Sequence, residues 1–420
     1  MVIPILLLAA CLTPLRSDDP PAFTSTPVQV VPVSTVQPDG STVTTVPPGH
    51  AWLTYARAAK PGDQIVLQNG FHVGHRLEGL HGTREKPIVI RGADSTLPAA
   101  VACEEYGIEL SDCSWIRLEN LYFMNPRLAA VLVEGSAERK PPAERPDVSI
   151  SLAGLKVALA IDAPAADGIR IRNARNVGVV ACRFEGWGDA AVEVDGASGV
   201  VISQCSLAPT PPATPPVGIA VRGGSESVVI FHTVMERGMR TGVRCGECGE
   251  GDAPAGSGDA LVYTPSPADA VRVDRCMFLE IPCPVEFGPG RGAAMTSCTV
   301  VDPATAWRVD ALCGTVDATV RGCLFTWTPG ILMATCERRG DAIEDMVRLE
   351  SNLWWSPEVP AVFEVLGRPF GLVAGPQILD VDPRLSDRTF SPSNPAAQAF
   401  GWTAGTGAPA APASGLPPGP

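Results

Sequence analysis

A short pattern of apolar residues recurs nine times between residues 116 and 354. Each copy reads apolar, any, apolar, any, any, X, any, large apolar, and most copies follow one another by a little over twenty residues. In chain order, position X is occupied by Leu121, Ala153, Cys182, Cys205, Thr233, Cys276, Cys298, Cys323 and Asn352. A unit of this length cannot bury its apolar face alone, so successive copies must stack on one another.

Each copy alternates apolar and other residues with a period of two, which is typical of a strand with one buried face. A second alternating segment lies about eight residues before several copies, as in Ile169-Arg170-Ile171 and Val192-Glu193-Val194. No helical period separates these segments. We therefore predict an all-β fold, a single-stranded right-handed parallel β-helix of about ten coils.

The cysteines at position X have two interpretations. A coil-on-coil stack places Cys182, Cys205, Cys276, Cys298 and Cys323 in one interior column, where a small polarizable thiol suits a tight corner. A metal site is the alternative, but thiols spaced one coil apart in a line lack the convergent pairs of a zinc site. We predict core packing.

The two ends of the chain differ from its repetitive middle. Residues 1–17 contain a short apolar run followed by Leu8-Ala9-Ala10-Cys11, which resembles a bacterial lipobox and makes Cys11 a candidate lipidation site, although no Lys or Arg precedes the run. We expect an extended leader over 18–48, the β-helix over 49–401 and a disordered Pro/Ala/Gly tail over 402–420. This organisation predicts export to the periplasm, the cell surface or the medium.

A short helix is expected at the start of the β-helix. Trp52, Leu53, Ala56 and Ala59 follow helical spacing and are succeeded by a Pro-Gly pair. Such a helix would cover the apolar mouth of the first coil, which an open solenoid needs.

The composition limits the partners. The formal net charge is −13 with an acidic pI near 4.9, so nucleic acid and anionic membrane surfaces are unfavourable partners. A membrane contact is expected only through an N-terminal lipid, and a monomer is the simplest expectation.

Three segments carry a resemblance to a known superfamily. AAKPGDQIVLQNGFHV at 58–73 with GTREKPIVIRG at 82–92 resembles the opening coil of pectate-lyase-like right-handed parallel β-helix proteins, especially the chondroitinase B and alginate lyase branch. DPRLSDRTFSPSNPAAQAFG at 382–401 is similar to the closing segment of that branch. The resemblance implies a carbohydrate-active protein whose site lies on outward strand positions and on the adjacent loops.

Charged residues, Glu286 among them, occupy the outward positions of the earlier strand in several coils. The candidate substrate-binding residues are Arg170, Arg172, Asp189, Glu193, Asp195 and Arg237. The candidate catalytic residues are Arg222, Arg240 and Arg244. An Arg fork binds a uronate carboxylate in bidentate fashion, which points to an acidic glycan. The alternative is a solvated face of cross-strand ion pairs without a ligand.

The catalytic chemistry stays open between several classes. A lyase needs a base beside the uronate carboxylate and positive charge for the enolate. The resembling branch uses a Lys with an Arg, but the four lysines lie at 60, 86, 140 and 156, outside the central and C-terminal coils. An Arg base, as in pectate lyases, is the alternative, and hydrolysis by Asp189, Glu193 and Asp195 ranks below both.

A long insertion at 244–270 contains Cys245-Gly-Glu-Cys248 and five carboxylates. A lone Cys-x-x-Cys favours a local disulfide or packing over zinc. No cofactor is assigned with certainty; calcium on Glu247, Glu250, Asp252 and Asp259 is one alternative, although the ligand order of an EF-hand is missing.

Taken together, these features predict an exported, polysaccharide-lyase-like protein that acts on or binds an acidic glycan. The alternative is a non-catalytic surface module that binds a glycan or another protein.

Overall fold

The computed structural model describes residues 31–94, 99–138, 140–158, 166–210, 216–250, 263–310, 314–327, 333–336, 346–355, 363–365, 368–370 and 378–379. Contacts group residues 32–420 into one compact unit. Three long sheets, named A, B and C here, make up most of that unit.

Sheet A contains β1 (Val33–Val36), β2 (Thr42–Val46), β3 (Gln64–Leu67), β6 (Ile88–Gly92), β9 (Ile116–Glu119), β12 (Asp147–Ala153), β15 (Arg175–Val180), β18 (Val201–Ser203), β22 (Val229–Phe231), β28 (Arg272–Asp274), β31 (Gly290–Thr296), β34 (Val316–Arg321) and β37 (Val347–Glu350). Sheet B contains β4 (Gly70–Val73), β7 (Ala99–Ala102), β10 (Leu121–Met124), β13 (Lys156–Ala158), β16 (Arg183–Phe184), β19 (Ser206–Leu207), β23 (Val234–Met235), β29 (Met277–Leu279), β32 (Thr299–Val301), β35 (Leu324–Thr326), β38 (Leu353–Trp355) and β41 (Ile378–Leu379).

Sheet C contains β5 (His75–Glu78), β8 (Tyr106–Ser111), β11 (Ala129–Glu134), β14 (Asp167–Arg172), β17 (Ala190–Asp195), β20 (Val217–Arg222), β24 (Thr241–Cys245), β30 (Cys283–Phe287), β33 (Thr305–Val309) and β36 (Met333–Cys336). The smaller elements are the pairs β21 (Ser225–Glu226) with β27 (Ala268–Asp269), β25 (Glu247–Glu250) with β26 (Tyr263–Ser266) and β39 (Phe363–Val365) with β40 (Arg368–Phe370), the helix α1 (Trp52–Arg57) and the 3₁₀ turn η1 (Pro142–Glu144).

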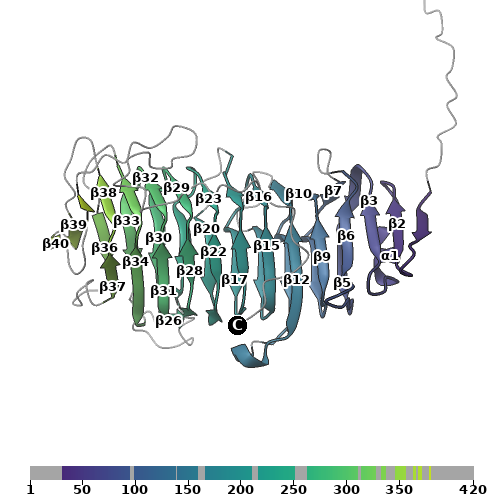
Figure 1. The fold of residues 1–420 in the computed structure, drawn as a ribbon, viewed down its shortest axis with the longest axis horizontal. Coiled ribbons are helices and arrows are strands. Elements are labelled where there is room, and N and C mark those ends of the chain that lie inside the picture. Colours follow the sequence, from purple (N-terminus) through teal and green to yellow (C-terminus); the bar gives the residue numbers. More distant parts are fainter. Residues whose placement is uncertain are drawn as a thin grey trace, which may run out of the picture. The chain divides into compact units, whose positions relative to one another are not determined.

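The order of strands within each sheet defines the architecture. From β3 onward the chain visits sheets A, B and C in turn and then returns to sheet A one strand further along, with parallel pairing throughout the long sheets. Successive coils follow one another in chain order from purple to green (Figure 1). This confirms the predicted right-handed parallel β-helix. The number of about ten coils stays a prediction, because the chain beyond residue 355 is described only in short pieces.

The predicted interior column of thiols is confirmed. The register pairs Val180 with Ser203 in sheet A and Arg183 with Ser206 in sheet B, so Cys182 lies directly below Cys205. The same register continues through Thr233, Cys276, Cys298, Cys323 and Asn352. The side chains in this series are at most 2% exposed.

The prediction that Ala153 belongs to the column is wrong. Lys156 pairs with Arg183, which puts Leu155 rather than Ala153 in line with Cys182. The cause is a register irregularity between Asp147 and Ile150, where Ser149 adopts a φ of 44°. Because Val148 is also buried there, the apolar pattern taken from the sequence begins two residues early.

The column residues hydrogen-bond to backbone groups of their own coil or of a neighbouring coil. The thiol of Cys205 contacts the carbonyl oxygens of Val179 and Ser203, and the amide of Asn352 donates to Val320 and accepts from the N–H of Cys323. Each thiol, hydroxyl or amide at this position therefore donates a hydrogen bond to a backbone carbonyl oxygen. This shared requirement explains why Cys, Thr and Asn all occur at this position of the column.

The predicted helix is confirmed as α1, between β2 and β3. Trp52 and Ala56 are fully buried, and Nε1 of Trp52 donates to the carbonyl oxygen of Val73 at 2.8 Å. The predicted boundary at residue 49 is too late, however. β2 pairs in parallel with β3, and β1 pairs with β2 in antiparallel fashion, so part of the expected leader belongs to sheet A. Short runs of Val and Thr between prolines conceal these two strands in the sequence.

Candidate functional site

The outward face of sheet C carries a row of charged side chains that alternate in sign. The parallel register aligns, coil after coil, Arg76, Glu109, Leu132, Arg170, Glu193, Ala220, Arg244, Glu286 and Arg308. A second row two residues further along each strand contains Glu134, Arg172, Asp195 and Arg222. Neighbouring strands lie about 4.8 Å apart, so successive members of a row can contact one another.

Two buried carboxyl groups flank Arg170 of the first row. Asp167 is fully buried and Glu193 is 1% exposed. Arg170 bridges them: its guanidinium lies 2.5 Å from Oδ2 of Asp167 and 2.5 Å from Oε2 of Glu193. Oδ1 of Asp167 also accepts the N–H of Ala190 at 3.0 Å. The two acids are thus held by one arginine and by the backbone of the next coil.

The ion pairs continue from Glu193 towards the C-terminal coils. Nε of Arg222 donates to Oε1 of Glu193 at 2.9 Å, and its Nη1 donates to Oε2 of Glu247 at 2.8 Å. Glu247 also lies 3.4 Å from Arg244, which in turn lies 2.7 Å from Glu286.

Arg308 closes this series at 3.4 Å from Glu286. A continuous network therefore spans the strands from β14 to β33. We refer to Asp167, Arg170, Glu193, Arg222, Glu247, Arg244, Glu286 and Arg308 as the sheet-C network.

Burial is the largest single influence on the pKa of Asp167, Glu193 and Glu286. Burial together with the charge of Glu193 raises the pKa of Asp167 to about 8. Burial also acts to raise the pKa of Glu193, but a hydrogen bond from Asp167 and the charges of Arg222 and Arg170 outweigh it, so this pKa lies below its usual range. At neutral pH the pair therefore shares one proton, which resides on Asp167.

The remaining shifts follow from the same causes. Burial raises the pKa of Glu286 in spite of Arg244 and Arg308. The pKa of Arg222 lies above its ordinary value, because the attraction of Glu193 and Glu247 exceeds the effect of burial. The pKa of Arg170 is raised in the same way, because the attraction of Asp167 and Glu193 outweighs the opposing effect of its burial.

Arg222 and Arg308 are more exposed than the carboxylates of Glu193 and Glu286 with which they pair. Side-chain exposure is 2% for Glu193 and 7% for Glu286, against 27% for Arg222 and 41% for Arg308. The contacts with Glu193 and Glu247 use three of the five N–H donors of Arg222. The outward surface of the network therefore presents the partly exposed guanidinium groups of Arg222 and Arg308 together with the carboxylate of Glu247, which is 28% exposed. Asp189 lies at its margin, 3.8 Å from Arg222.

The structure brings most of the predicted site residues onto this face. Arg170, Glu193, Arg222 and Arg244 belong to the network, and Arg172 and Asp195 lie opposite one another in the second row. Two predictions lie elsewhere. Arg237 is 78% exposed and pairs with Glu280 at 3.6 Å, and Arg240 is an exposed residue just before β24. Among the described residues, no ion pair joins either of them to the network. The turn between coils carries them away from the row of sheet C.

The sequence interpretation missed three members of the network. Asp167 precedes the first apolar residue of β14, and its burial is not evident from an alternating pattern. Glu247 lies in β25, beyond the expected strand, and was considered only as a calcium ligand. Arg308 is the outward residue of β33, and extending the register of Glu286 by one coil would have found it.

Two excursions of the chain lie beside this face. Arg145 follows η1, and its Nη2 donates to the carbonyl oxygen of Gly224 at 2.7 Å, although 79 residues separate them. Asn173 donates to the carbonyl oxygen of Ser136 in the same excursion. The second excursion begins with Glu247, whose carboxylate clamps Arg222 and Arg244. Both excursions leave from the end of sheet C strands, at the side of the second row.

Metal and lipid predictions fall largely outside the described residues. Cys11, Asp252 and Asp259 lie there, as does the side chain of Glu250. Within the described part of the chain, no group of three or more His, Cys, Asp or Glu side chains is arranged to hold a metal ion. No helix in that part is long and apolar enough to cross a bilayer.

No family model and no curated protein matches the sequence. Among solved structures, an alginate lyase from Paenibacillus sp. str. FPU-7 is similar with 15% identity and a TM-score of 0.46 over 76% of this chain and 98% of the lyase. A mannuronic acid specific family 6 polysaccharide lyase from human gut microbiota gives 12% identity and 0.46 over 77% and 83% of the two chains. XylC in complex with xylose gives 8% identity and 0.48 over 79% and 83%. At these values the likenesses assign no activity, and the β-helix rests on the strand pairing itself.

Proposed function

We propose that the protein binds a carbohydrate chain that contains uronate units, along the outward face of sheet C. The observation that carries the proposal is the arrangement of the sheet-C network, in which the guanidinium groups of Arg222, Arg244 and Arg308 are more exposed than the carboxylates of Glu193 and Glu286 beneath them. A guanidinium fork matches the geometry of a carboxylate, and its free N–H groups also donate to sugar hydroxyls. The sequence resemblance to carbohydrate-active β-helix proteins supports the same class of ligand.

The repeat of the fold supports a chain-like ligand. Arg222 and Arg244 lie on neighbouring strands, and Arg308 lies two strands further along the same sheet. Cationic groups are thus repeated at multiples of about 4.8 Å along one direction. Such a row suits a polymer with repeated negative charges better than one small anion.

The electrostatics favour binding over catalysis by these residues. An arginine that removes a proton must first lose its own, and Glu193 and Glu247 raise the pKa of Arg222 still further. Hydrolysis needs two carboxyl groups separated by at least about 5 Å with sugar between them. Asp167 and Glu193 are instead buried and hydrogen-bonded to each other. The proposed function is therefore a non-catalytic glycan-binding face.

A direct comparison of binding and turnover tests this proposal. Calorimetry with pectate, alginate and glycosaminoglycans should give saturable binding for at least one polymer, and the carboxyl-reduced form of that polymer should bind much more weakly. Ultraviolet absorbance of unsaturated products should stay flat under the same conditions. Absence of binding to every polyuronate would reject the proposal, and a steady rise in absorbance would replace it with a lyase.

Export belongs to the proposal as well, because a polysaccharide ligand is met outside the cytoplasm. Residues 1–17 would direct it, and Cys11 would carry a lipid after cleavage. Expression of the full chain in a bacterial host with labelled palmitate should give a labelled, membrane-associated protein. Replacement of Cys11 by Ser should remove the label, whereas retention of an unprocessed cytoplasmic chain would contradict the export proposal.

A further inference from the structure

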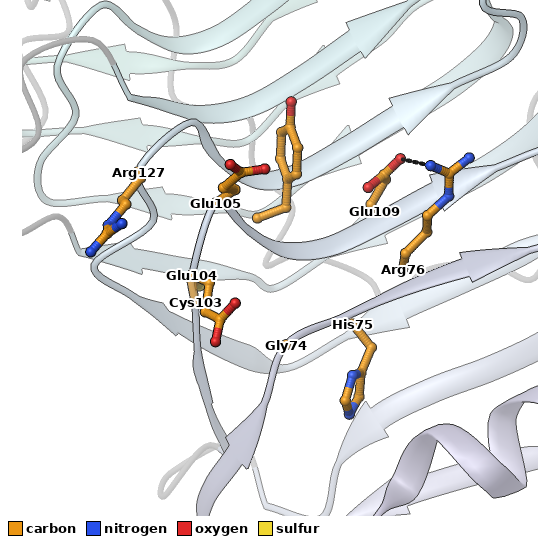
Figure 2. A pocket seen from close by; sticks show the side chains of 9 residues that line it. Gly74, His75, Arg76, Cys103, Glu104, Glu105, Glu109 and Arg127 are labelled. Carbon is orange, nitrogen blue, oxygen red and sulfur yellow. Dashed lines mark ion pairs between the residues drawn. The ribbon is translucent and has the colours of Figure 1, made fainter.

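A pocket of about 520 Å³ opens beside the first strands of sheet C. Its lining comes from three successive coils: Gly74, His75, Arg76, Cys103, Glu104, Glu105, Tyr106, Glu109 and Arg127. Figure 2 shows Arg127 on one side, the Arg76–Glu109 ion pair on the other, and Glu104 and Glu105 between them. The volume falls in the range of about 300–1,000 Å³ that is usual for small-molecule sites.

The first coils are closely stacked beside this pocket. A Cβ atom on Gly74 would lie 2.3 Å from the carbonyl oxygen of Gly107, so only glycine fits there. A Cβ atom on Gly107 would in turn meet Phe123 and Ala130 at 2.5 Å. The backbones of successive coils are therefore in direct contact at these two glycines.

The lining suits a ligand with many hydroxyl groups. The carboxylates of Glu104, Glu105 and Glu109 are acceptors, and Arg127 and Tyr106 supply donors. Burial raises the pKa of Tyr106, so its phenol keeps its proton. Burial and the charge of Arg57 lower the pKa of His75, which leaves that ring neutral.

The charges of the lining disfavour a uronate in this place. Three carboxylates face two arginines, and Arg76 is already paired with Glu109 at 3.4 Å and with Glu78 at 3.5 Å. A metal ion has no site here, because no group of metal-binding side chains is formed among the described residues. An uncharged, hydroxylated ligand remains the best match.

The pocket lies at the end of the charged row. Arg76 and Glu109 are the first two members of that row, and Leu132 alone separates Glu109 from Arg170. Tyr106 is close enough to Arg170 and Arg172 for their charges to act on its pKa. A chain that lies along the sheet-C network would therefore reach the pocket with its end.

We propose that this pocket binds the uncharged terminal sugar of a heteropolysaccharide whose uronate units lie on the sheet-C network. The inference rests on the proposed function for the identity of the polymer, and it adds that the protein recognises a chain end. The predicted ligand class is a glycan with both neutral and uronate units, held by its neutral end.

Fluorine NMR of Tyr106 tests the pocket separately from the arginines. The chain has four tyrosines, so fluorotyrosine labelling gives four signals, and Tyr106→Phe identifies one of them. We expect at least one of cellobiose, maltose and N,N′-diacetylchitobiose to shift that signal saturably, and digalacturonate to leave it unchanged. Glu104→Gln should weaken the effective sugar about tenfold, because one charged hydrogen bond is lost.

The control variants separate the two proposals. Arg183 is an exposed residue of sheet B that pairs with Glu185, so Arg183→Met should change neither the Tyr106 signal nor polymer binding. Arg222→Met should weaken polymer binding and leave the disaccharide shift intact. If no neutral sugar shifts Tyr106 while Arg222→Met still weakens polyuronate binding, the pocket inference fails and the binding face stands. A shift by digalacturonate alone would also overturn the inference.

Discussion

Asp167 and Glu193 show how a β-helix can hide two acids beneath a polar face. Both side chains are buried, and together they have Arg170, Arg222 and the N–H of Ala190 as partners. Removing one member of such a buried set costs about 3–5 kcal/mol, because the others lose their compensation. The pair therefore determines how firmly Arg170 and Arg222 are held at the surface.

The shared proton predicts a pH-dependent stability. The pKa of Asp167 is about 8 when folded and near 3.8 when unfolded, so the folded protein binds the extra proton between these values. The free energy of unfolding should then fall as pH rises from about 4 to 8, by at most about 1.4 kcal/mol per pH unit. Urea unfolding at several pH values should show this slope for the wild type and lose it in Asp167→Asn.

The slope rather than the absolute stability is the readout, because the amide also alters the contact with Arg170. Asp189 provides the matched control: it is 42% exposed, and Asp189→Asn should retain the slope of the wild type. Equal slopes in the wild type and Asp167→Asn would show that the buried pair holds no proton near neutrality.

The interior column makes a second prediction at this scale. Cys276 lies next to Thr233 in the column, and both are fully buried. A hydroxyl can donate as the thiol does, so Cys276→Thr should change the free energy of unfolding by less than about 1.5 kcal/mol. Cys276→Asp should destabilise by several kcal/mol, because its charge would have no partner in the core. Thermal unfolding of the two variants checks this, and equal losses would place the residue outside the column.

From β9 to β38, each described turn from sheet A to sheet B passes through one residue with positive φ. The series includes Asn120, Gly154, Ala181, Gln204, His232, Arg275, Ser297, Gly322 and Ser351. This residue immediately precedes the column position, so the turn directs the next side chain into the core. A sequence search cannot find these corners easily, because only two of the nine are glycines.

Ala181 is the least suited of these corner residues, with a φ of 53° and no polar side chain to stabilise it. Replacement by Gly should therefore raise the free energy of unfolding by about 0.5–1 kcal/mol, since it removes the strain of the left-handed conformation. Ala191→Gly, in the middle of β17, is the control and should lower it. Chemical denaturation of both variants measures the difference, and a loss in Ala181→Gly would contradict the corner assignment.

Sequence patterns predicted the strands and their outward residues, but they did not predict which charged side chains pair with one another. Period-two alternation identified the outward positions of Arg170, Glu193 and Arg244, because alternation fixes which face a residue occupies. It could not show which acid each long arginine reaches. Glu247 pairs with Arg222 across 25 residues from a hairpin that the repeat does not contain. The start of sheet A was missed because β1 and β2 precede the first full repeat.

At the scale of the whole molecule, one stacking rule places both candidate sites. The same register that lines up the thiols inside also lines up the charged row outside. The row joins the sheet-C network to the pocket of the first coils, so the polymer-binding face and the chain-end site follow from one repeat. The fold was predictable from that repeat. The pocket was not, because part of its lining comes from loops between the strands, which carry no repeat pattern.

The affinity for a polyuronate with and without the guanidinium edges tests the central claim most directly. Calorimetry should show that Arg222→Met and Arg244→Met each weaken binding about tenfold or more, as expected for the loss of a charge-assisted fork, while Arg183→Met binds like the wild type. Circular dichroism should confirm that all three variants remain folded. Undiminished affinity in both folded sheet-C variants would contradict the account.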